Sequence, residues 1–139
     1  MKLIKYFIQF IIIIISFVIF KILGPRLSSS ISGKIFELIG PFFRPKRIIH
    51  SNIKRGFKNI NSKNLKNITN LMWNNYGRLF AEYMFIKDFR NGRLSQNIQI
   101  DGQEILDEIK KSNKQVIFIS GHFSNFELMA MYLEKTGIK

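Results

Sequence analysis

Two residues that could form a proton-transfer pair lie near the end of the sequence, within residues 120–127 (SGHFSNFE). The imidazole of His122 can accept a proton from a hydroxyl group, and the carboxylate of Glu127 can fix the ring tautomer and support the imidazolium. If both residues were helical, they would lie about 140° apart and could not share a face. His122 is therefore expected just before a helix, with Glu127 in its first or second turn.

Simpler explanations of the same residues stay open. A histidine can cap a helix, and a glutamate in the first turn complements the helix dipole. A zinc site is disfavoured, because His122 and Glu127 supply too few ligands and no third ligand is placed nearby. The other histidine, His50, lies in a basic stretch and is expected at the surface. The absence of cysteine excludes disulfides, thiolate catalysis and cysteine-based zinc sites.

The segments around this pair predict an α/β fold. Residues 116–120 (VIFIS) form a short apolar, β-branched run that is typical of a buried strand. Gly121 allows a sharp turn, and a helix is expected over about residues 124–135. The polar pair would then follow the carboxyl end of a strand, which is the usual place for a site in such sheets. A short strand ending at Ile100 is also expected, followed by a helix to Lys111 that Asp101 caps.

A longer helix is expected earlier, from Ser62 as its cap to about Lys87. An apolar stripe at spacings of three and four predicts its buried face. A glycine inside this helix, Gly77, costs about 1 kcal/mol relative to alanine and indicates close packing. The stripe consists of Leu65, Ile68, Met72, Tyr76, Leu79, Tyr83 and Ile86.

The N-terminal segment is apolar and predicts a transmembrane anchor helix. Residues 3–23 would span roughly 31 Å, which is enough to cross the hydrocarbon core. Lys5 and Lys21 stand near its ends, and Gly24-Pro25 ends it. A cleaved signal peptide and an interfacial helix are the alternatives, but isoleucines all round the helix favour spanning. A short amphipathic helix over residues 31–39 follows, closed by Gly40-Pro41.

The basic charge is concentrated beside this anchor. The chain has 22 Lys and Arg against 9 Asp and Glu, and residues 44–66 contain eight bases and no acid. A basic zone next to a hydrophobic anchor favours an anionic membrane surface as partner, although an ordinary solvated face fits equally well. Nucleic acid is disfavoured, because no nucleic-acid-binding motif accompanies the charge. The excess of cations after the anchor predicts that the body of the protein lies on the cytoplasmic side.

The spacing of His122 and Glu127 resembles the H-x-x-x-x-D/E motif of the lysophospholipid-type acyltransferases. It is more closely similar to the N-terminal part of the bacterial lipid A biosynthesis (lauroyl/myristoyl) acyltransferase family, in which the motif commonly reads GHxGNWE. Here Ser124 replaces the second glycine and Phe126 replaces the tryptophan. Looser matches are Asn52, residues 76–78 with Glu82, and residues 101–104 with Leu106.

The resemblance implies an enzyme of the inner membrane. It would move an acyl chain from acyl-carrier protein, as the donor co-substrate, to a hydroxyl of a lipid A precursor, with no other cofactor. His122 would be the general base, Glu127 would orient it, and Asn125 would contact the substrate. The expected domains are an anchor helix (residues 1–24), a basic membrane-proximal region (25–61) and the N-terminal part of the acyltransferase domain (62–139).

The same family predicts more sheet than these residues supply. The chain is therefore expected to be a fragment that is inactive as it stands, or to need a partner. Two other functions stay open: acyl transfer to a phospholipid or another glycolipid, and a membrane-anchored basic scaffold without catalysis. The scaffold would not depend on His122.

Overall fold

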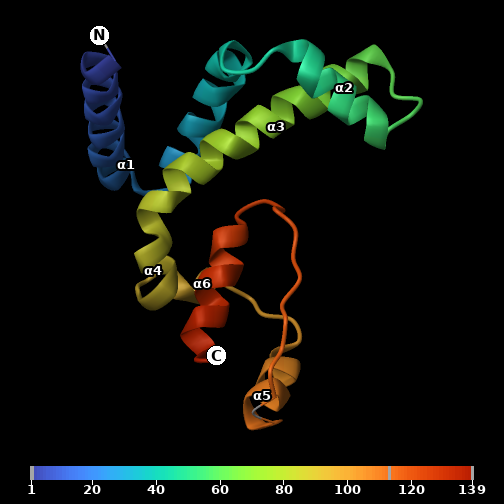
Figure 1. Cartoon of the computed structure of the whole chain (residues 1–139). Helices are drawn as coiled ribbons and strands as arrows, with labels where there is room; N and C mark the ends of the chain where they lie inside the picture. The colour runs from blue at the N-terminus through green and yellow to red at the C-terminus, as the bar shows by residue number, and fades with distance from the viewer. Residues whose placement is uncertain (1, 113, 139) are drawn as a thin grey trace. The chain divides into compact units, whose positions relative to one another are not determined.

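The computed structural model describes residues 2–112 and 114–138, which form helices joined by irregular segments (Figure 1). The chain divides after Met84 into two compact units, each described by itself. The α-helices are α1 (Lys2–Ile39), α2 (Lys46–Gly56), α3 (Ser62–Glu82), α4 (Ile86–Asn91), α5 (Gln103–Ser112) and α6 (Phe126–Thr136). Single 3-10 turns are η1 (Gly40–Phe42), η2 (Tyr83–Phe85) and η3 (Ser95–Asn97).

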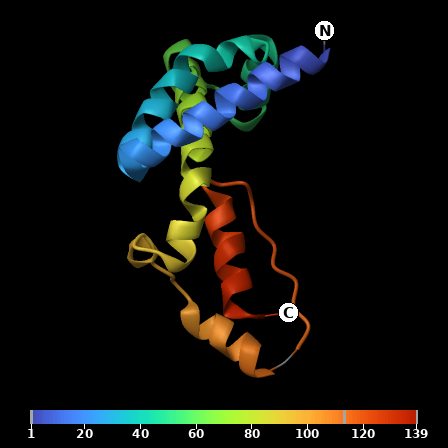
Figure 2. The same ribbon diagram turned by 90° about the vertical axis from the view of Figure 1, so that its left-hand side faces the viewer.

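Helix α1 changes direction at Gly24, as Figures 1 and 2 show. Gly24 has φ 77° and ψ 170°, a conformation open to glycine, and Pro25 then starts the second part of the helix. At the kink, the hydroxyl of Ser28 donates to the carbonyl oxygen of Gly24 at 2.7 Å and to that of Phe20 at 2.9 Å. The predicted break at Gly24-Pro25 is confirmed, but the second part begins earlier than the expected residue 31.

The first part of α1 is the most apolar part of the chain. By length and composition alone, the helical stretch Lys2–Phe42 can cross a membrane, and its apolar portion is almost entirely exposed within the described residues. Residues 2–23 rise about 33 Å at 1.5 Å per residue, close to the thickness of a hydrocarbon core.

The second part of α1 packs closely against α3. A β-carbon added at Gly77 would lie 2.3 Å from the carbonyl oxygen of Ser32, so the two backbones touch at this point. Two polar pairs flank the contact: Ser29 donates to Glu82 at 2.8 Å, and the Asn74 amide donates to the Glu37 carboxylate. The prediction that Gly77 marks close packing is confirmed.

Phe80 of α3 fills the angle between the two parts of α1. Its ring centroid lies 5.6 Å from that of Phe17, 5.9 Å from that of Phe20 and 5.6 Å from that of Phe36. Aromatic pairs at these distances attract beyond their buried area. The cluster therefore joins the apolar first part of α1 to the rest of the first unit.

The buried face of α3 differs from the predicted stripe. Leu65 is buried as expected, but Tyr76 is 53% exposed and Tyr83 is 48% exposed. The reason is the close approach to α1, which selects small or flat residues every fourth position rather than the most apolar ones. The buried residues of α3 are Leu65, Thr69, Trp73, Gly77 and Ala81.

The start of α3 also differs by one residue from the prediction. The cap is Asn61, whose side chain accepts a hydrogen bond from the backbone N–H of Asn64 at 2.8 Å, and Ser62 is the first helical residue. Both residue types are good caps, so the sequence did not discriminate between them. Helix α5 similarly begins at Gln103, after Gly102 with φ 85°, rather than directly after Asp101.

The second unit holds α6 against α4 and α5 by polar contacts. Arg90 of α4 forms an ion pair with Glu134, and Lys135 donates to the backbone carbonyl of Arg90 at 2.8 Å. From the α5 side, the hydroxyl of Tyr132 donates to Gln103 at 2.7 Å. These contacts set the direction of the helix that follows the candidate catalytic residues.

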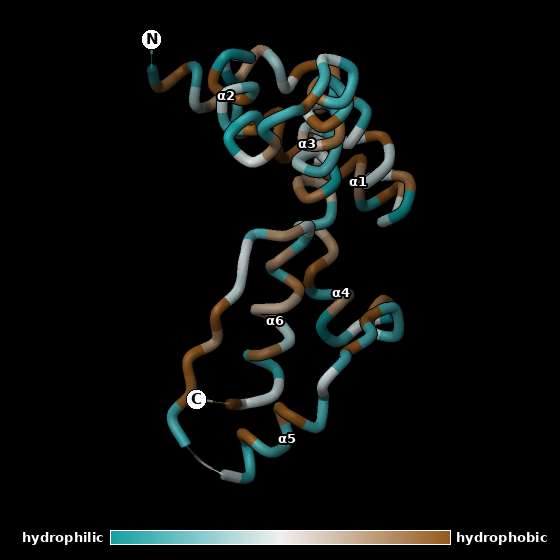
Figure 3. The backbone as a smooth tube through the Cα atoms, turned by 90° about the vertical axis from the view of Figure 1, so that its right-hand side faces the viewer, coloured by the Kyte–Doolittle hydropathy of each residue, from teal (hydrophilic) through white to brown (hydrophobic). Residues whose placement is uncertain are grey.

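The expected strands are wrong for the residues that the structure describes. Residues 116–120 are irregular, and Ile117 and Ile119 are 90% and 93% exposed; Ile100 likewise ends no strand. This apolar stretch appears brown just before α6 in Figure 3. A strand forms only when its backbone groups pair with a neighbour, and no described segment lies alongside to pair with it. The α/β part of the predicted fold class is therefore replaced by a helical arrangement.

Replacing Gly77 with alanine should destabilise the first unit. The new methyl group would overlap the Ser32 carbonyl oxygen, and overpacking of this kind costs about 1–3 kcal/mol, against a gain of about 1 kcal/mol in helix propensity. We expect thermal unfolding in detergent to shift downward by several degrees.

Gly56→Ala is the matched control, since nothing lies within 4 Å of a β-carbon at Gly56. Equal transition temperatures for the two variants would contradict close packing at Gly77.

Candidate active site

His122 lies in the irregular segment that leads into α6, and its side chain is exposed. The N-cap of α6 is Asn125, so His122 lies three residues before the cap and is not the cap residue. Its ring meets the ring of Phe126 edge-on, with centroids 4.3 Å apart. The prediction that His122 precedes a helix is confirmed, and the aromatic neighbour limits where the imidazole can point.

The turn between His122 and α6 contains a strained residue. Ser124 has φ 45°, in the left-handed region, and it is the one non-glycine residue with positive φ in the described chain. Such a conformation costs a residue with a β-carbon roughly 1–2 kcal/mol. Strain of this kind persists where the surrounding structure requires it, often at functional sites.

Glu127 lies in the first turn of α6, one residue after Phe126, and is half-buried. A carboxylate in this position interacts favourably with the positive end of the helix dipole. Asn125, the third predicted site residue, is also half-buried, and its backbone carbonyl accepts from the N–H of Leu128 at 3.1 Å. The structure thus brings His122, Asn125 and Glu127 to the same end of α6.

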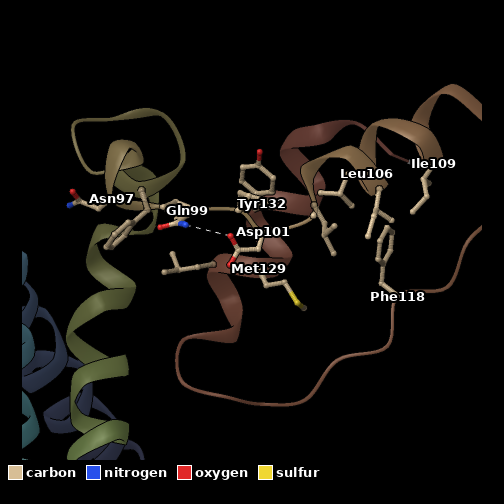
Figure 4. A pocket seen from close by; sticks show the side chains of 15 residues that line it. Asn97, Gln99, Asp101, Leu106, Ile109, Phe118, Met129 and Tyr132 are labelled. Atoms are coloured by element: carbon tan, nitrogen blue, oxygen red, sulfur yellow. Dashed lines mark hydrogen bonds between the residues drawn. The ribbon is translucent and has the colours of Figure 1, made fainter.

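An open apolar pocket of about 620 Å³ lies along the next turns of α6 (Figure 4). Leu128 and Met129, which directly follow Glu127, belong to its wall, and Figure 4 shows Met129 and Tyr132 facing Leu106 of α5 across the pocket. Phe118, from the apolar stretch before His122, closes another side. The volume is in the range of small-molecule sites, and most of the wall is aliphatic or aromatic.

A family-level sequence comparison matches the whole chain. The family is described as bacterial lipid A biosynthesis acyltransferase, and the match covers residues 1–139. The chain belongs to this family. Comparison with curated proteins and with solved structures gives no match. The suspected resemblance to the lipid A acyltransferases is therefore confirmed, and it gives the chain an acyltransferase lineage.

Comparison with the motif of the lipid A acyltransferase family explains two structural features, the backbone angle of Ser124 and the ring contact of Phe126. The usual glycine of the GHxGNWE motif stands where this chain has Ser124 at φ 45°, a conformation that glycine adopts freely. The usual tryptophan stands where Phe126 meets the His122 ring. The sequence predicted neither consequence, because neither the backbone angle of Ser124 nor the ring contact of Phe126 can be read from spacing. The pocket was also missed, since its walls come from four separated segments.

Substitution of Ser124 should separate backbone strain from side-chain chemistry. Ser124→Gly should stabilise the second unit slightly, by up to about 1 kcal/mol, because glycine tolerates this φ. Ser124→Val should destabilise it by about 1–2 kcal/mol, because β-branched residues strongly disfavour positive φ. Amide hydrogen exchange across α6 measures both effects.

Ser120→Val supplies the control in the same irregular segment, at a residue without positive φ. If valine changed the stability equally at both positions, the result would contradict a left-handed conformation of Ser124.

Proposed function

We propose that this acyltransferase moves a fatty acyl chain from acyl-carrier protein to a hydroxyl of a lipid A precursor. The observation that supports this most is the position of His122 and Glu127 at the start of α6, beside an apolar pocket, in a chain of the lipid A acyltransferase family. The site would act on lipid at the inner membrane, with the first part of α1 as the anchor. The excess of cations after that helix favours the cytoplasmic side.

His122 would act as the general base. Its free ring nitrogen takes the proton of the acceptor hydroxyl, and the oxygen attacks the carbonyl carbon of the acyl thioester. The tetrahedral intermediate then releases the carrier thiolate, which receives the proton from the imidazolium. The products are the new ester and free carrier thiol, so the proton is conserved within the site.

Glu127 would orient the His122 ring and stabilise its protonated form, and Asn125 would contact the substrate. The exposed position of His122 supports this assignment, because an acceptor hydroxyl on a large lipid has to reach the ring from outside. The edge-on contact with Phe126 supports a restricted ring orientation, which a base needs for proton transfer.

The acyl chain would lie in the pocket along α6. The wall residues next to Glu127 are apolar, so a chain whose thioester is held near His122 can continue over Leu128 and Met129 toward Leu133. Each methylene group buried there contributes about 0.8 kcal/mol. The pocket would therefore bind the donor chain and favour a limited range of lengths.

The first prediction for this site concerns His122 itself. In membranes that contain the full-length gene product, His122→Ala should lower the rate of transfer from acyl-carrier protein to a lipid A precursor by a factor of about 100 or more. His50→Ala is the control, because His50 lies in the first unit among cations of α2.

Three results would contradict parts of the proposal. Activity that survives His122→Ala would return the residue to a structural role. Transfer to a phospholipid but not to lipid A precursors would show that the acceptor is a phospholipid. Absence of transfer to any lipid, with membrane association intact, would favour a basic scaffold.

The second prediction concerns the pocket. Leu133→Phe adds bulk to the wall and should shift donor preference toward shorter chains. Loss of room for two methylene groups would change the ratio of kcat/KM for long and short donors by roughly tenfold. Leu71→Phe on the exposed side of α3 is the control for the substitution itself. An unchanged ratio would place the acyl chain elsewhere.

A further inference from the structure

A second apolar pocket, of about 520 Å³, lies in the first unit, and none of the residues assigned to catalysis lines it. Three helices line it: Phe36 comes from α1, Ile49 and Ile53 come from α2, and Trp73 comes from α3. Trp73 is 8% exposed, and its indole N–H is buried with no hydrogen-bond acceptor among the described residues. Most of the wall is therefore apolar.

Aromatic side chains connect the pocket to the apolar first part of α1. Phe36 belongs to the pocket wall and also contacts Phe80, whose ring meets Phe17 and Phe20 of that apolar part. Phe42 and Phe43, in the segment that links α1 to α2, are 89% and 73% exposed, as interfacial aromatics are.

One cationic side chain lines the pocket, and the helix α2 beside it is basic. Arg44 lines the pocket, and α2 contains no acidic residue. Ile49 and Ile53 turn toward the pocket, while the other side of α2 forms a polar hollow. That hollow is lined by Arg47, His50, Ser51, Lys54 and Arg55. Helix α2 is thus amphipathic, with its apolar side over the pocket and its cations on the opposite side.

We propose that this pocket, defined by the α1–α2–α3 residues above, binds one anionic membrane phospholipid. An acyl tail occupies the space beside Trp73, and the phosphate pairs with Arg44, which lines the pocket. The cations on the other side of α2 attract the anionic membrane surface. The charge is complementary to such a headgroup, and juxtamembrane cations of this density bind anionic leaflets. A nucleic acid would use the cations but leave the apolar pocket empty, whereas a phospholipid uses both.

The bound lipid would be structural rather than a substrate, because no residue assigned to catalysis lines its pocket. The pocket belongs to the first unit, and His122, Asn125 and Glu127 belong to the second. The inference therefore does not depend on the proposed acyl transfer, and failure of one leaves the other standing. A lipid held there would join α2 to α1 and α3 at the surface of the membrane.

Trp73 gives a direct test, because it is the single tryptophan of the chain. The full chain in uncharged detergent micelles is titrated with phosphatidylglycerol that has brominated acyl tails, and Trp73 fluorescence is recorded. Bromine quenches only at close contact, so a tail in the pocket should give saturable quenching. Brominated phosphatidylcholine, with the same tails and no net charge, should need an approximately fivefold higher concentration or more.

Two variants test the two halves of the site. Arg44→Gln should raise the midpoint of the phosphatidylglycerol titration about fivefold, whereas Lys66→Gln, an exposed cation of α3 outside the pocket, should leave it nearly unchanged. Ile53→Phe fills the pocket and should abolish saturation while the helical circular dichroism is retained. Since Arg44 is exposed, its variant keeps the test decisive even if Ile53→Phe does not fold.

Several results would overturn the proposal. Equal quenching by the two brominated lipids would remove the role of the headgroup charge. Equal weakening by Arg44→Gln and Lys66→Gln would indicate diffuse attraction to a charged surface. Displacement of the lipid by glycerol 3-phosphate, which has the charge and no tail, would indicate an anion site without an acyl pocket.

Discussion

The contact of two helix backbones at Gly77 determines how the first unit is built. With the Ser32 carbonyl oxygen only 2.3 Å from the position of a β-carbon, no other residue fits without movement of one helix. Helices approach this closely when small residues recur on the facing sides, and α1 buries Ser28, Ser29, Ser32 and Gly33 here. Packing of small surfaces brings little hydrophobic gain, so van der Waals contact and the hydrogen bonds at Ser29 and Asn74 have to stabilise the pair.

This packing has consequences for the apolar residues. Because small residues occupy the interface, Ile31 and Ile35 of the second part of α1 remain outside it, and the isoleucines of the first part are exposed as well. In water such a surface would favour aggregation, whereas a bilayer solvates it. Small-residue contacts between helices and large apolar residues facing outward are together typical of membrane proteins. The family and the helix length point in the same direction.

The sequence predicted local backbone features better than it predicted which segments pack or pair with one another. Gly24-Pro25 was predictable as a break because φ preferences are local, and Gly77 was predictable as a close contact because a helix rarely keeps a glycine without use. The buried stripe of α3 was not, since apolar periodicity assumes that the largest apolar residues face inward. The strand at residues 116–120 was wrong for a similar reason: its composition suits a strand, but a strand also needs a neighbour, which composition does not supply.

The same distinction applies to the candidate site. The placement of His122 before a helix and Glu127 inside it followed from an angle of about 140° between their positions on one helix. The spacing of His122 and Glu127 could not predict the backbone conformation of the turn between them. Ser124 accepts a left-handed backbone, and the Asn125 carbonyl then starts the helical hydrogen bonding of α6. In the family motif a glycine takes that position without strain, so here the strain is the cost of a serine rather than of the turn. The turn itself is what brings an exposed imidazole and a half-buried carboxylate to the same end of α6, where the apolar pocket begins.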